Sequence, residues 1–375
     1  MPGETSSHPN EPPPGVTLPP SREESVSVLR RRWRKFKTLK RGWWSFLILL
    51  ALYLVSLLNP LLINNRALVV KHDGEYYFPA LAEWTTGKLH RAKDLGQRLI
   101  GEAQYRALKV QYEKEGKGDW VLMPPYPYGP YESLLEDPAL EGPPPHPPRA
   151  GHWLGTDDRA RDVFARLAYG FRISITFSLL VVLISYSIGV SVGALLGFFG
   201  GKVDFLGQRL VEIWAAIPFL YTVIIISAVV RPRLVDLAFL LGIFGWVGLS
   251  FYMRGEFYRE KSKDYVAAAI AQGDSRLSIM FNHILPNALT PVISFAPFAV
   301  VGGIGALVGL DFLGFGLQPP TPSWGELVNQ GKQNIMEWHL VTFPLGALFC
   351  TLMLVVFIGE AVREAFDPKV FSRLR

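Results

Sequence analysis

The chain has little cysteine and little charge, and it lacks the motifs of common catalytic centres. Cys350 is its single cysteine, which excludes an intrachain disulfide, and no Cys/His cluster has metal-ligand spacing. Charged residues make up 19% of the 375 residues, whereas a soluble domain usually has about a quarter. No His-Glu-x-x-His or Gly-x-Ser-x-Gly sequence occurs. We therefore expect no metal, no cofactor and no catalytic site in this chain.

A phosphate-binding loop is also absent. Residues 197–203, Gly-Phe-Phe-Gly-Gly-Lys-Val, superficially resemble one. The motif needs Gly-x-x-x-x-Gly-Lys-Ser/Thr, and here Leu196 and Val203 occupy the first Gly and the Ser/Thr positions. The chain thus has no ATPase centre, and the energy for any transport must come from a partner or a gradient.

Hydrophobic residues make up 49% of the chain and gather in six long runs. Each run reaches or approaches the roughly 20 residues that a helix needs to cross a membrane. The first follows a basic tail, and no small-residue cleavage site follows it, so we expect an anchor and not a removable signal. The sequence predicts an all-α membrane protein. Its six crossings cover residues 43–64, 168–199, 210–230, 234–253, 288–313 and 340–361.

Lysine and arginine are distributed unevenly around these runs. A dense basic cluster at residues 30–41 precedes the first run, which predicts a cytoplasmic N-terminus. With six crossings the C-terminus and residues 254–287 are then cytoplasmic as well, and the short outer connections hold only Arg231, Arg233 and Lys332. The net charge of +6 arises at these flanks, so we expect no nucleic-acid partner. Binding of DNA or anionic lipid by residues 30–41 is the alternative to a purely topogenic role.

The expected organisation follows from these runs. A basic cytoplasmic tail, 1–42, disordered at its start, leads into the first crossing, 43–64. A large periplasmic insertion, 65–167, precedes a five-helix core, 168–366, and a cytoplasmic tail, 367–375.

Two segments of the insertion allow more detailed predictions. Residues 88–115 favour one helix with an apolar stripe of Leu95, Leu99, Ala103 and Leu108. Residues 120–131 combine prolines with aromatics and cannot form a regular helix. These aromatics either contact a partner or pack the loop onto itself, and we favour self-packing.

The segment 264–287 is short and semi-polar, and it lies between apolar runs. It predicts a small-faced helix around 265–272, a stop at Gly273, a second short helix from Ser275 and a restart at Pro286. Glycine accepts the left-handed cap that other residues resist, and proline suits the first turn of a helix. Alanines at 267–269 would let another protein approach closely.

This segment resembles the coupling loop of ABC importer permeases. That pattern has Glu-Ala-Ala, three residues, Gly, nine residues, and Ile-x-Leu-Pro. Ala267 replaces the Glu and His283 replaces the Ile, which leaves the docking role standing without a charged contact from the Glu. The resemblance implies that an ATPase docks at Tyr265, Ala268, Ala269, Gly273, Leu285 and Pro286.

Further segments resemble dipeptide and oligopeptide permeases: 154–174, 310–327 and 357–368. Residues 73–79, in the insertion, resemble the branch that carries microcin C and oligopeptides. The resemblance implies a multi-pass permease of the bacterial inner membrane that imports peptides or peptide-like compounds. It also implies three partners besides membrane lipid: a second homologous permease, ATPase subunits that bind ATP and Mg, and a periplasmic solute-binding protein.

Gly189, Gly193, Gly197 and Gly201 recur every four residues on one helical face. Such a stripe permits close approach of a neighbouring helix. It serves either a subunit or gating interface or static packing inside one subunit, and the sequence leaves both open. Pro218, Pro297 and Pro344 are candidate kinks, because proline removes a backbone hydrogen bond.

Two functions of other classes fit the same runs. A gradient-driven secondary transporter would need no ATPase, and a non-transporting membrane scaffold would use the outer insertion to bind partners. The sequence does not identify a solute, because specificity resides largely in the binding protein.

The basic flanks predict that residues 254–287 are cytoplasmic and that 65–167 are outside. A cysteine introduced as Ser275→Cys in a Cys350-replaced background should stay unlabelled by an impermeant thiol reagent in intact cells with a permeabilised outer membrane. A cysteine placed in the insertion should label under the same conditions. Labelling of Ser275→Cys would overturn this topology.

Overall fold

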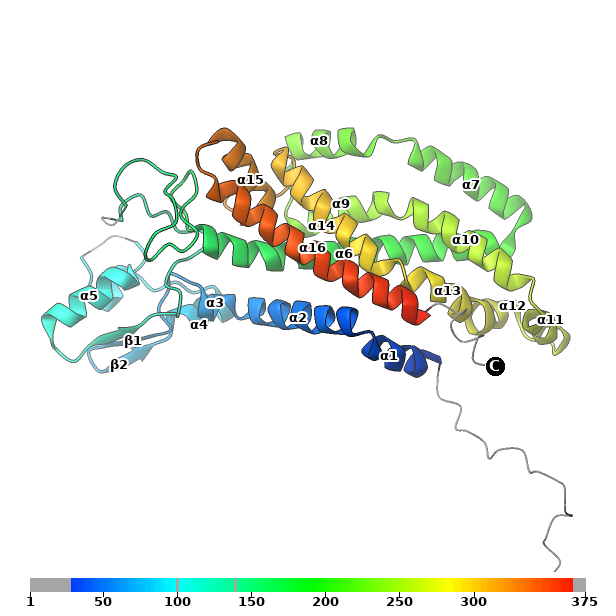
Figure 1. Ribbon diagram of the computed structural model, residues 1–375, viewed down its shortest axis with the longest axis horizontal. Coiled ribbons are helices and arrows are strands. Elements are labelled where there is room, and N and C mark those ends of the chain that lie inside the picture. Colours follow the sequence, from blue (N-terminus) through cyan, green and yellow to red (C-terminus); the bar gives the residue numbers. More distant parts are fainter. Residues whose placement is uncertain (1–27, 99–100, 138–139, 367–375) are drawn as a thin grey trace, which may run out of the picture.

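The computed structural model describes residues 28–98, 101–137 and 140–366. Long helices run side by side, and a small insertion with short strands lies at one end of them (Figure 1). The predicted disordered N-terminal stretch and the predicted tail at 367–375 lie outside the described residues.

The described helices match an all-α membrane fold. Three of them are long and apolar enough to cross a membrane, namely α2 (Lys40–Leu57), α6 (Val163–Phe199) and α16 (His339–Phe366). Three further groups qualify jointly, although they bend by 59°, 44° and 52°. If each bent group is one crossing, the total is the predicted six. The groups are α7 (Gly201–Ala215) with α8 (Phe219–Val229), α9 (Leu234–Gly245) with α10 (Val247–Lys261), and α12 (Arg276–Ser278), η2 (Ile279–Ile284) and α13 (Leu285–Ile293) with α14 (Ala296–Phe312).

Prolines accompany two of these bends. Pro218 directly precedes α8, and Pro297 lies in the first turn of α14. Pro344 lies inside α16, which continues unbroken from His339 to Phe366. Because Pro344 stands in the second turn, its missing hydrogen bond affects only the start of that helix. The first two candidate kinks are therefore confirmed, and the third forms no break.

Helix α6 is the central helix, and it packs along α9, α10 and α14. Its glycines permit an unusually close contact with α10. A Cβ atom added at Gly189 would lie 2.8 Å from the Trp246 carbonyl oxygen, and one added at Gly193 would lie 2.5 Å from the Ser250 carbonyl oxygen. At Gly197 it would lie 2.6 Å from the Phe257 Cβ. These glycines thus serve packing inside the chain.

Gly201 does not share this contact. It begins α7 with a φ of 55°, and no atom lies within 4 Å of the position a Cβ would take. The stripe is therefore shorter than the predicted series of four glycines, because α6 ends at Phe199.

The insertion between α2 and α6 has a hydrophobic core of its own. A three-stranded antiparallel sheet, in the order β2 (Glu75–Tyr77), β1 (Val69–His72) and β3 (Trp120–Leu122), contributes Val70 and Val121 to this core. Helix α2 ends at Leu57, before the predicted end of the first crossing at residue 64, because α3 starts at Asn59. The elements are α3 (Asn59–Leu62), β1 (Val69–His72), β2 (Glu75–Tyr77), α4 (Pro79–Thr86), η1 (Ala92–Leu95), α5 (Tyr105–Glu115) and β3 (Trp120–Leu122).

The prediction of a single helix over residues 88–115 is wrong. The chain forms η1 and α5 instead, and Gly96 and Gly101 between them have φ angles of 75° and 117°. Such positive angles end a helix. Three members of the predicted stripe, Leu95, Ala103 and Leu108, are nevertheless buried together, and Leu99 lies outside the described residues.

The aromatic segment 120–131 packs partly on itself, as favoured, because the rings of Tyr126 and Tyr128 contact each other edge to face, with centroids 5.3 Å apart. Tyr126 is buried between Trp153 and Phe164, and its hydroxyl donates to Asp162 Oδ2 at 2.7 Å. Trp120 and Tyr131 remain exposed.

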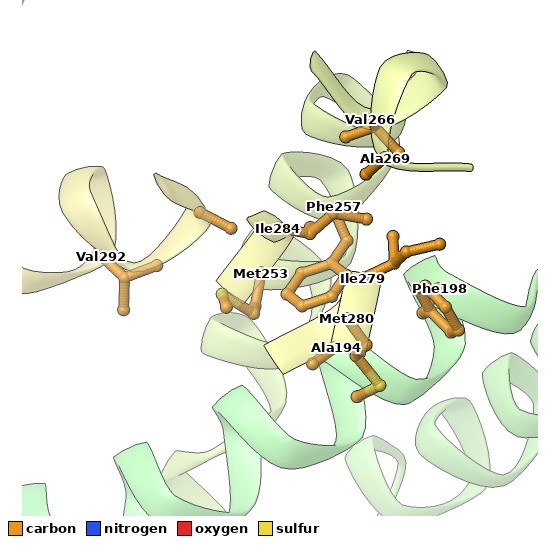
Figure 2. Packing of buried hydrophobic residues seen from close by; sticks show 11 residues of the cluster. Ala194, Phe198, Met253, Phe257, Val266, Ala269, Ile279, Met280, Ile284 and Val292 are labelled. Carbon is orange, nitrogen blue, oxygen red and sulfur yellow. The ribbon is translucent and has the colours of Figure 1, made fainter. Parts of the chain in front are cut away.

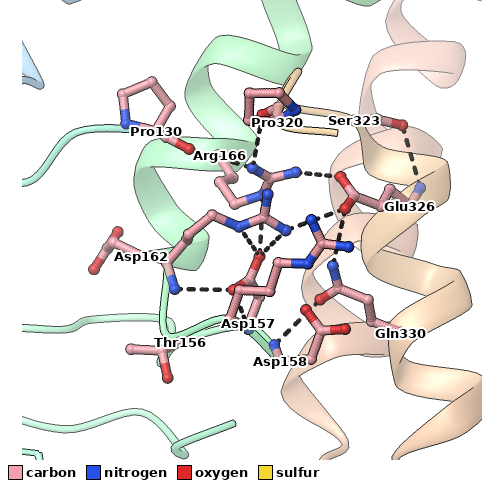
Figure 3. Close-up of polar contacts among 12 residues, drawn as sticks. Pro130, Thr156, Asp157, Asp158, Asp162, Arg166, Pro320, Ser323, Glu326 and Gln330 are labelled. Atoms are coloured by element: carbon pink, nitrogen blue, oxygen red, sulfur yellow. Dashed lines mark hydrogen bonds and ion pairs between the residues drawn. The ribbon is translucent and has the colours of Figure 1, made fainter. Parts of the chain in front are cut away.

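A buried network of charges joins the start of α6 to α15 (Trp324–Gln333) at the insertion end (Figure 3). Arg161 donates to Asp157 Oδ2 at 2.7 Å and to Glu326 Oε1 at 3.1 Å. Arg166 is fully buried, forms an ion pair with Glu326, and donates to the carbonyl oxygens of Pro130 and Pro320, both at 3.2 Å. Two guanidinium groups thus share two carboxylates.

We expect Glu326→Ala to destabilise the protein severely. It would leave Arg161 and Arg166 buried beside a single carboxylate, and breaking a buried ion pair costs about 3–5 kcal/mol. The measurement is the thermal unfolding midpoint of the purified protein in detergent. Glu113→Ala, which removes an exposed carboxylate in α5, is the control. Equal midpoints for the two variants would contradict this role of the network.

Candidate functional site

The bundle end opposite the insertion is built from α11 (Asp264–Ala271), α12, η2 and α13 (Figure 1). Helix α1 (Val28–Thr38) lies at the same end of the bundle. It is held there by a hydrogen bond of 2.8 Å from Arg32 Nη1 to Thr290 Oγ1 in α13. This end contains the segment that the sequence singles out.

Helix α11 has one buried face and one exposed face. Val266 and Ala269 point inward, into a hydrophobic cluster with Phe257 and Ile279 (Figure 2). The exposed residues of α11 are Asp264, Ala267, Ala268, Ile270 and Ala271. Small residues therefore dominate the exposed side, which keeps the helix backbone close to the surface.

Gly273 ends α11 in the predicted way. Its φ is 85°, a left-handed conformation that favours glycine. Its N–H donates to the Ile270 carbonyl at 3.0 Å, and the Asp274 N–H donates to the Ala269 carbonyl at 3.1 Å. This pair of bonds is the Schellman motif, which satisfies the last carbonyls of a helix.

The second helix begins as predicted but continues further. Ser275 caps α12 by accepting the Ser278 N–H at 3.2 Å. The chain then continues through the π-helical η2 directly into α13, so no break precedes Pro286. Pro286 does occupy the first turn of α13. The wider turn of η2 lets the helix pass a residue that has no N–H.

Polar contacts fix this turn onto α10. Glu260 is almost fully buried and accepts from Lys263 Nζ at 2.6 Å and from the Tyr265 hydroxyl at 2.9 Å. Burial and the Glu260 contact raise the pKa of Tyr265 to about 12, so its hydroxyl stays a donor at neutral pH. His283, which stands at the Ile position of the coupling-loop pattern, lies 2.7 Å from Asp274 through its Nε2.

The six residues predicted for docking take different positions. Ala268, Gly273 and Pro286 are exposed. Ala269 is buried, and the half-buried Tyr265 and Leu285 pack against the same core. The structure thus brings the segment to one end, with some of these residues on the surface and others supporting it from inside. Their contact with an ATPase stays a prediction.

Three exposed apolar side chains at this end were not predicted from the sequence. Ile270, Leu277 and Phe281 are 61%, 62% and 53% exposed. They belong to α11, α12 and η2, and α11 and α12 both pack against η2. We call them, together with Ala268, the end surface. The four-residue spacing of Leu277 and Phe281 was the available signal, but the same spacing is typical of a core-facing stripe.

The described residues also contain a cavity of about 590 Å³ between α6, α7, α8, α9 and α14. Aliphatic residues and glycines line most of it, and Tyr186, Trp214 and Phe244 are among its aromatic residues. The Trp214 Nε1–H donates to the Ile243 carbonyl at 2.9 Å, which leaves the cavity largely apolar.

One group of possible metal ligands lies in the insertion, among the described residues. His72, Asp73 and Asp119 have ligand atoms within 4.8 Å of one another. The His72 Nδ1 already contacts Asp119 Oδ2 at 3.2 Å and the Tyr112 hydroxyl at 2.8 Å. These contacts join β1 to α5.

A bundle of up to six crossings with a short helical turn at one end is the architecture expected of a transporter's membrane subunit, and the comparisons with known proteins agree. Residues 189–372 match the family described as "Binding-protein-dependent transport system inner membrane component". The "Inner membrane ABC transporter permease protein YejE" of Escherichia coli (strain K12) is 41% identical, over 91% of this chain and 97% of that protein.

Two further relatives support the same assignment. The "Peptidoglycan transport system permease protein YejE" of Agrobacterium fabrum is 36% identical, over 93% of this chain and 95% of that protein. The "Dipeptide transport system permease protein DppC" of Bacillus subtilis is 35% identical, over 60% of this chain and 71% of that protein. The chain belongs to the binding-protein-dependent inner-membrane permeases of ABC importers.

We expect Gly273→Val to disrupt the turn that ends α11 while the protein still inserts into the membrane. A β-branched residue at a φ of 85° costs roughly 1–3 kcal/mol in backbone strain, which would re-aim α11. Gly273→Asn should be milder, because asparagine tolerates this conformation. The measurement is the ATPase activity and subunit retention of the purified complex.

Gly255→Val is the matched control for this substitution. Gly255 lies in α10 with no atom within 4 Å of its Cβ position and without a positive φ. Normal ATPase stimulation and retention in Gly273→Val would show that the cap is not needed for coupling.

Proposed function

We propose that this chain is a permease subunit of an ATP-driven importer for peptides or peptide-like compounds. Support for the solute class comes from relatives whose names describe dipeptide, oligopeptide and peptidoglycan transport. In this proposal a second homologous permease completes the pathway, and a periplasmic solute-binding protein delivers the solute. ATPase subunits bind ATP and Mg, and the chain itself catalyses no reaction.

The end surface is the observation that carries the proposal. Its apolar side chains are exposed at the tip of the bundle, on a helical segment whose other face packs into the core. An exposed apolar group of this kind marks a protein contact. It offers no nucleophile or paired carboxylates, so binding suits it and catalysis does not. In this proposal the end surface faces the cytoplasm and receives the ATPase.

The packing behind α11 supplies a route from this contact to the membrane helices. Val266 and Ala269 belong to the same hydrophobic cluster as Phe257 of α10, and this cluster also includes Ala194 and Phe198 of α6. Lys261 Nζ also donates to the Phe198 carbonyl at 2.6 Å. A push on α11 would therefore move α10 and α6 together, because packed interiors transmit displacement. The cavity beside α6 would change shape with them and expose the pathway to the other side.

The two alternatives make no use of this surface. A secondary transporter driven by a gradient needs no cytoplasmic docking turn, and a scaffold would concentrate its contacts on the outer insertion. Dependence of an ATPase on the end surface therefore separates the proposal from both.

We expect the triple variant Ile270→Ser, Leu277→Ser and Phe281→Ser to lose the ATPase during purification. Burial of each such side chain contributes on the order of 1.5–3 kcal/mol, so retention should fall at least about tenfold. The measurement is the ratio of ATPase to permease after affinity purification, with membrane-inserted protein quantified in parallel.

The matched control carries Ile335→Ser, Met336→Ser and Leu135→Ser. These residues are 85%, 88% and 64% exposed, and they lie between α15 and α16 or in the insertion. The control should retain the ATPase fully. Equal retention in both triple variants would refute docking at the end surface.

A further inference from the structure

Helix α1 presents two different faces. One face is fixed to the bundle: Phe36 is buried against Ala361 and Ala365 of α16. Arg32 Nη1 donates to Thr290 Oγ1 at 2.8 Å, and Lys35 Nζ donates to the Glu364 carbonyl at 2.9 Å. These contacts make α1 a rigid part of the same end of the bundle as α11.

The other face is basic and exposed. We call it the α1 surface, together with the first residues of α2. Residues 28–41 contain no aspartate or glutamate, and no ion pair within the described part of the chain joins the exposed cations to a carboxylate. The α1 surface consists of Arg30, Arg31, Arg34, Lys37, Lys40 and Arg41.

The position of this surface is set by α2. The apolar α2 starts two residues after α1 ends, so the α1 surface begins where the hydrocarbon core ends. Trp33 and Trp44 are 46% and 61% exposed beside it, and tryptophan is enriched at the depth of lipid headgroups. An 11-residue helix is about 16 Å long, enough to cross a headgroup layer.

We infer that the α1 surface binds the phosphate headgroups of anionic phospholipids in the leaflet where α2 begins. Within the described residues these cations have no carboxylate partner, and phosphate oxygens accept charge-assisted hydrogen bonds from guanidinium groups. Basic side chains directly beside a membrane crossing attract anionic lipid over about a Debye length. The exposed tryptophans favour lipid over an acidic protein or nucleic acid, because an interfacial aromatic needs an apolar environment on one side.

Lipid binding would also affect the end surface. Arg32 connects α1 to α13, and α13 continues from the helices that carry Leu277 and Phe281. Headgroups that hold α1 in place therefore also hold the segment beneath the end surface. The inference goes beyond the proposed transport function and does not depend on it, since it needs only the membrane fold.

The test uses the purified full chain in phosphatidylcholine vesicles with a trace of spin-labelled lipid. Electron paramagnetic resonance gives the fraction of label immobilised at the protein, for spin-labelled phosphatidylglycerol and for spin-labelled phosphatidylcholine. The variant carries Arg30→Gln, Arg31→Gln, Arg34→Gln and Lys37→Gln. The control carries Lys88→Gln, Lys93→Gln, Lys109→Gln and Lys114→Gln, which removes the same charge from exposed positions of the insertion.

We expect wild type and control to prefer phosphatidylglycerol by about threefold or more at low salt, and the variant to show a preference near one. The wild-type preference should also fall as salt is raised, which tests the inference without any substitution. An unchanged preference in the variant, or no salt dependence in the wild type, would overturn it. The inference would also be overturned if the variant lost the ATPase but kept a normal lipid preference, because that result would assign the α1 surface to binding an acidic protein. No measurement of lipid preference requires ATPase or solute, so failure of the proposed function would leave this result intact.

Discussion

The close contact between α6 and α10 is the constraint on which the rest of the molecule depends. Gly189, Gly193 and Gly197 bring the α6 backbone against α10, and close backbone approach of this kind is a principal source of stability between helices in lipid. Lys261, the last residue of α10, bonds to the Phe198 carbonyl near the end of α6. The position of α11 therefore follows from where α10 ends relative to α6.

The two ends of the bundle use opposite chemistry for different purposes. At the insertion end, Arg161 and Arg166 share buried carboxylates, and such a network fixes one arrangement because each charge needs its partners. At the other end, Ile270, Leu277 and Phe281 are left exposed, which is costly unless a partner covers them. The insertion end is thus held together by charge pairs within the chain, and in the proposed complex a partner subunit covers the end surface.

Much of the fold could be predicted from the sequence because lipid imposes strong rules. The apolar runs predicted the crossings, and the glycine at position 273 predicted the left-handed cap at the end of α11. The turns at Gly96 and Gly101 were missed because a weak apolar stripe continued across them. The buried network was invisible because Arg161 and Glu326 are 165 residues apart. Exposure of Ile270 and Leu277 could not be predicted either, since apolar residues at helical spacing usually belong to a core.

The most direct test of the account is to identify what touches α11 in the assembled transporter. A photo-cross-linking amino acid would be placed in cells at Ala268, at Leu277 and, for comparison, at Ile335 between α15 and α16. The account predicts adducts with an ATPase subunit from Ala268 and Leu277 and none from Ile335. It would be contradicted if the complex assembled normally and Ala268 and Leu277 gave no such adduct, or if Ile335 did.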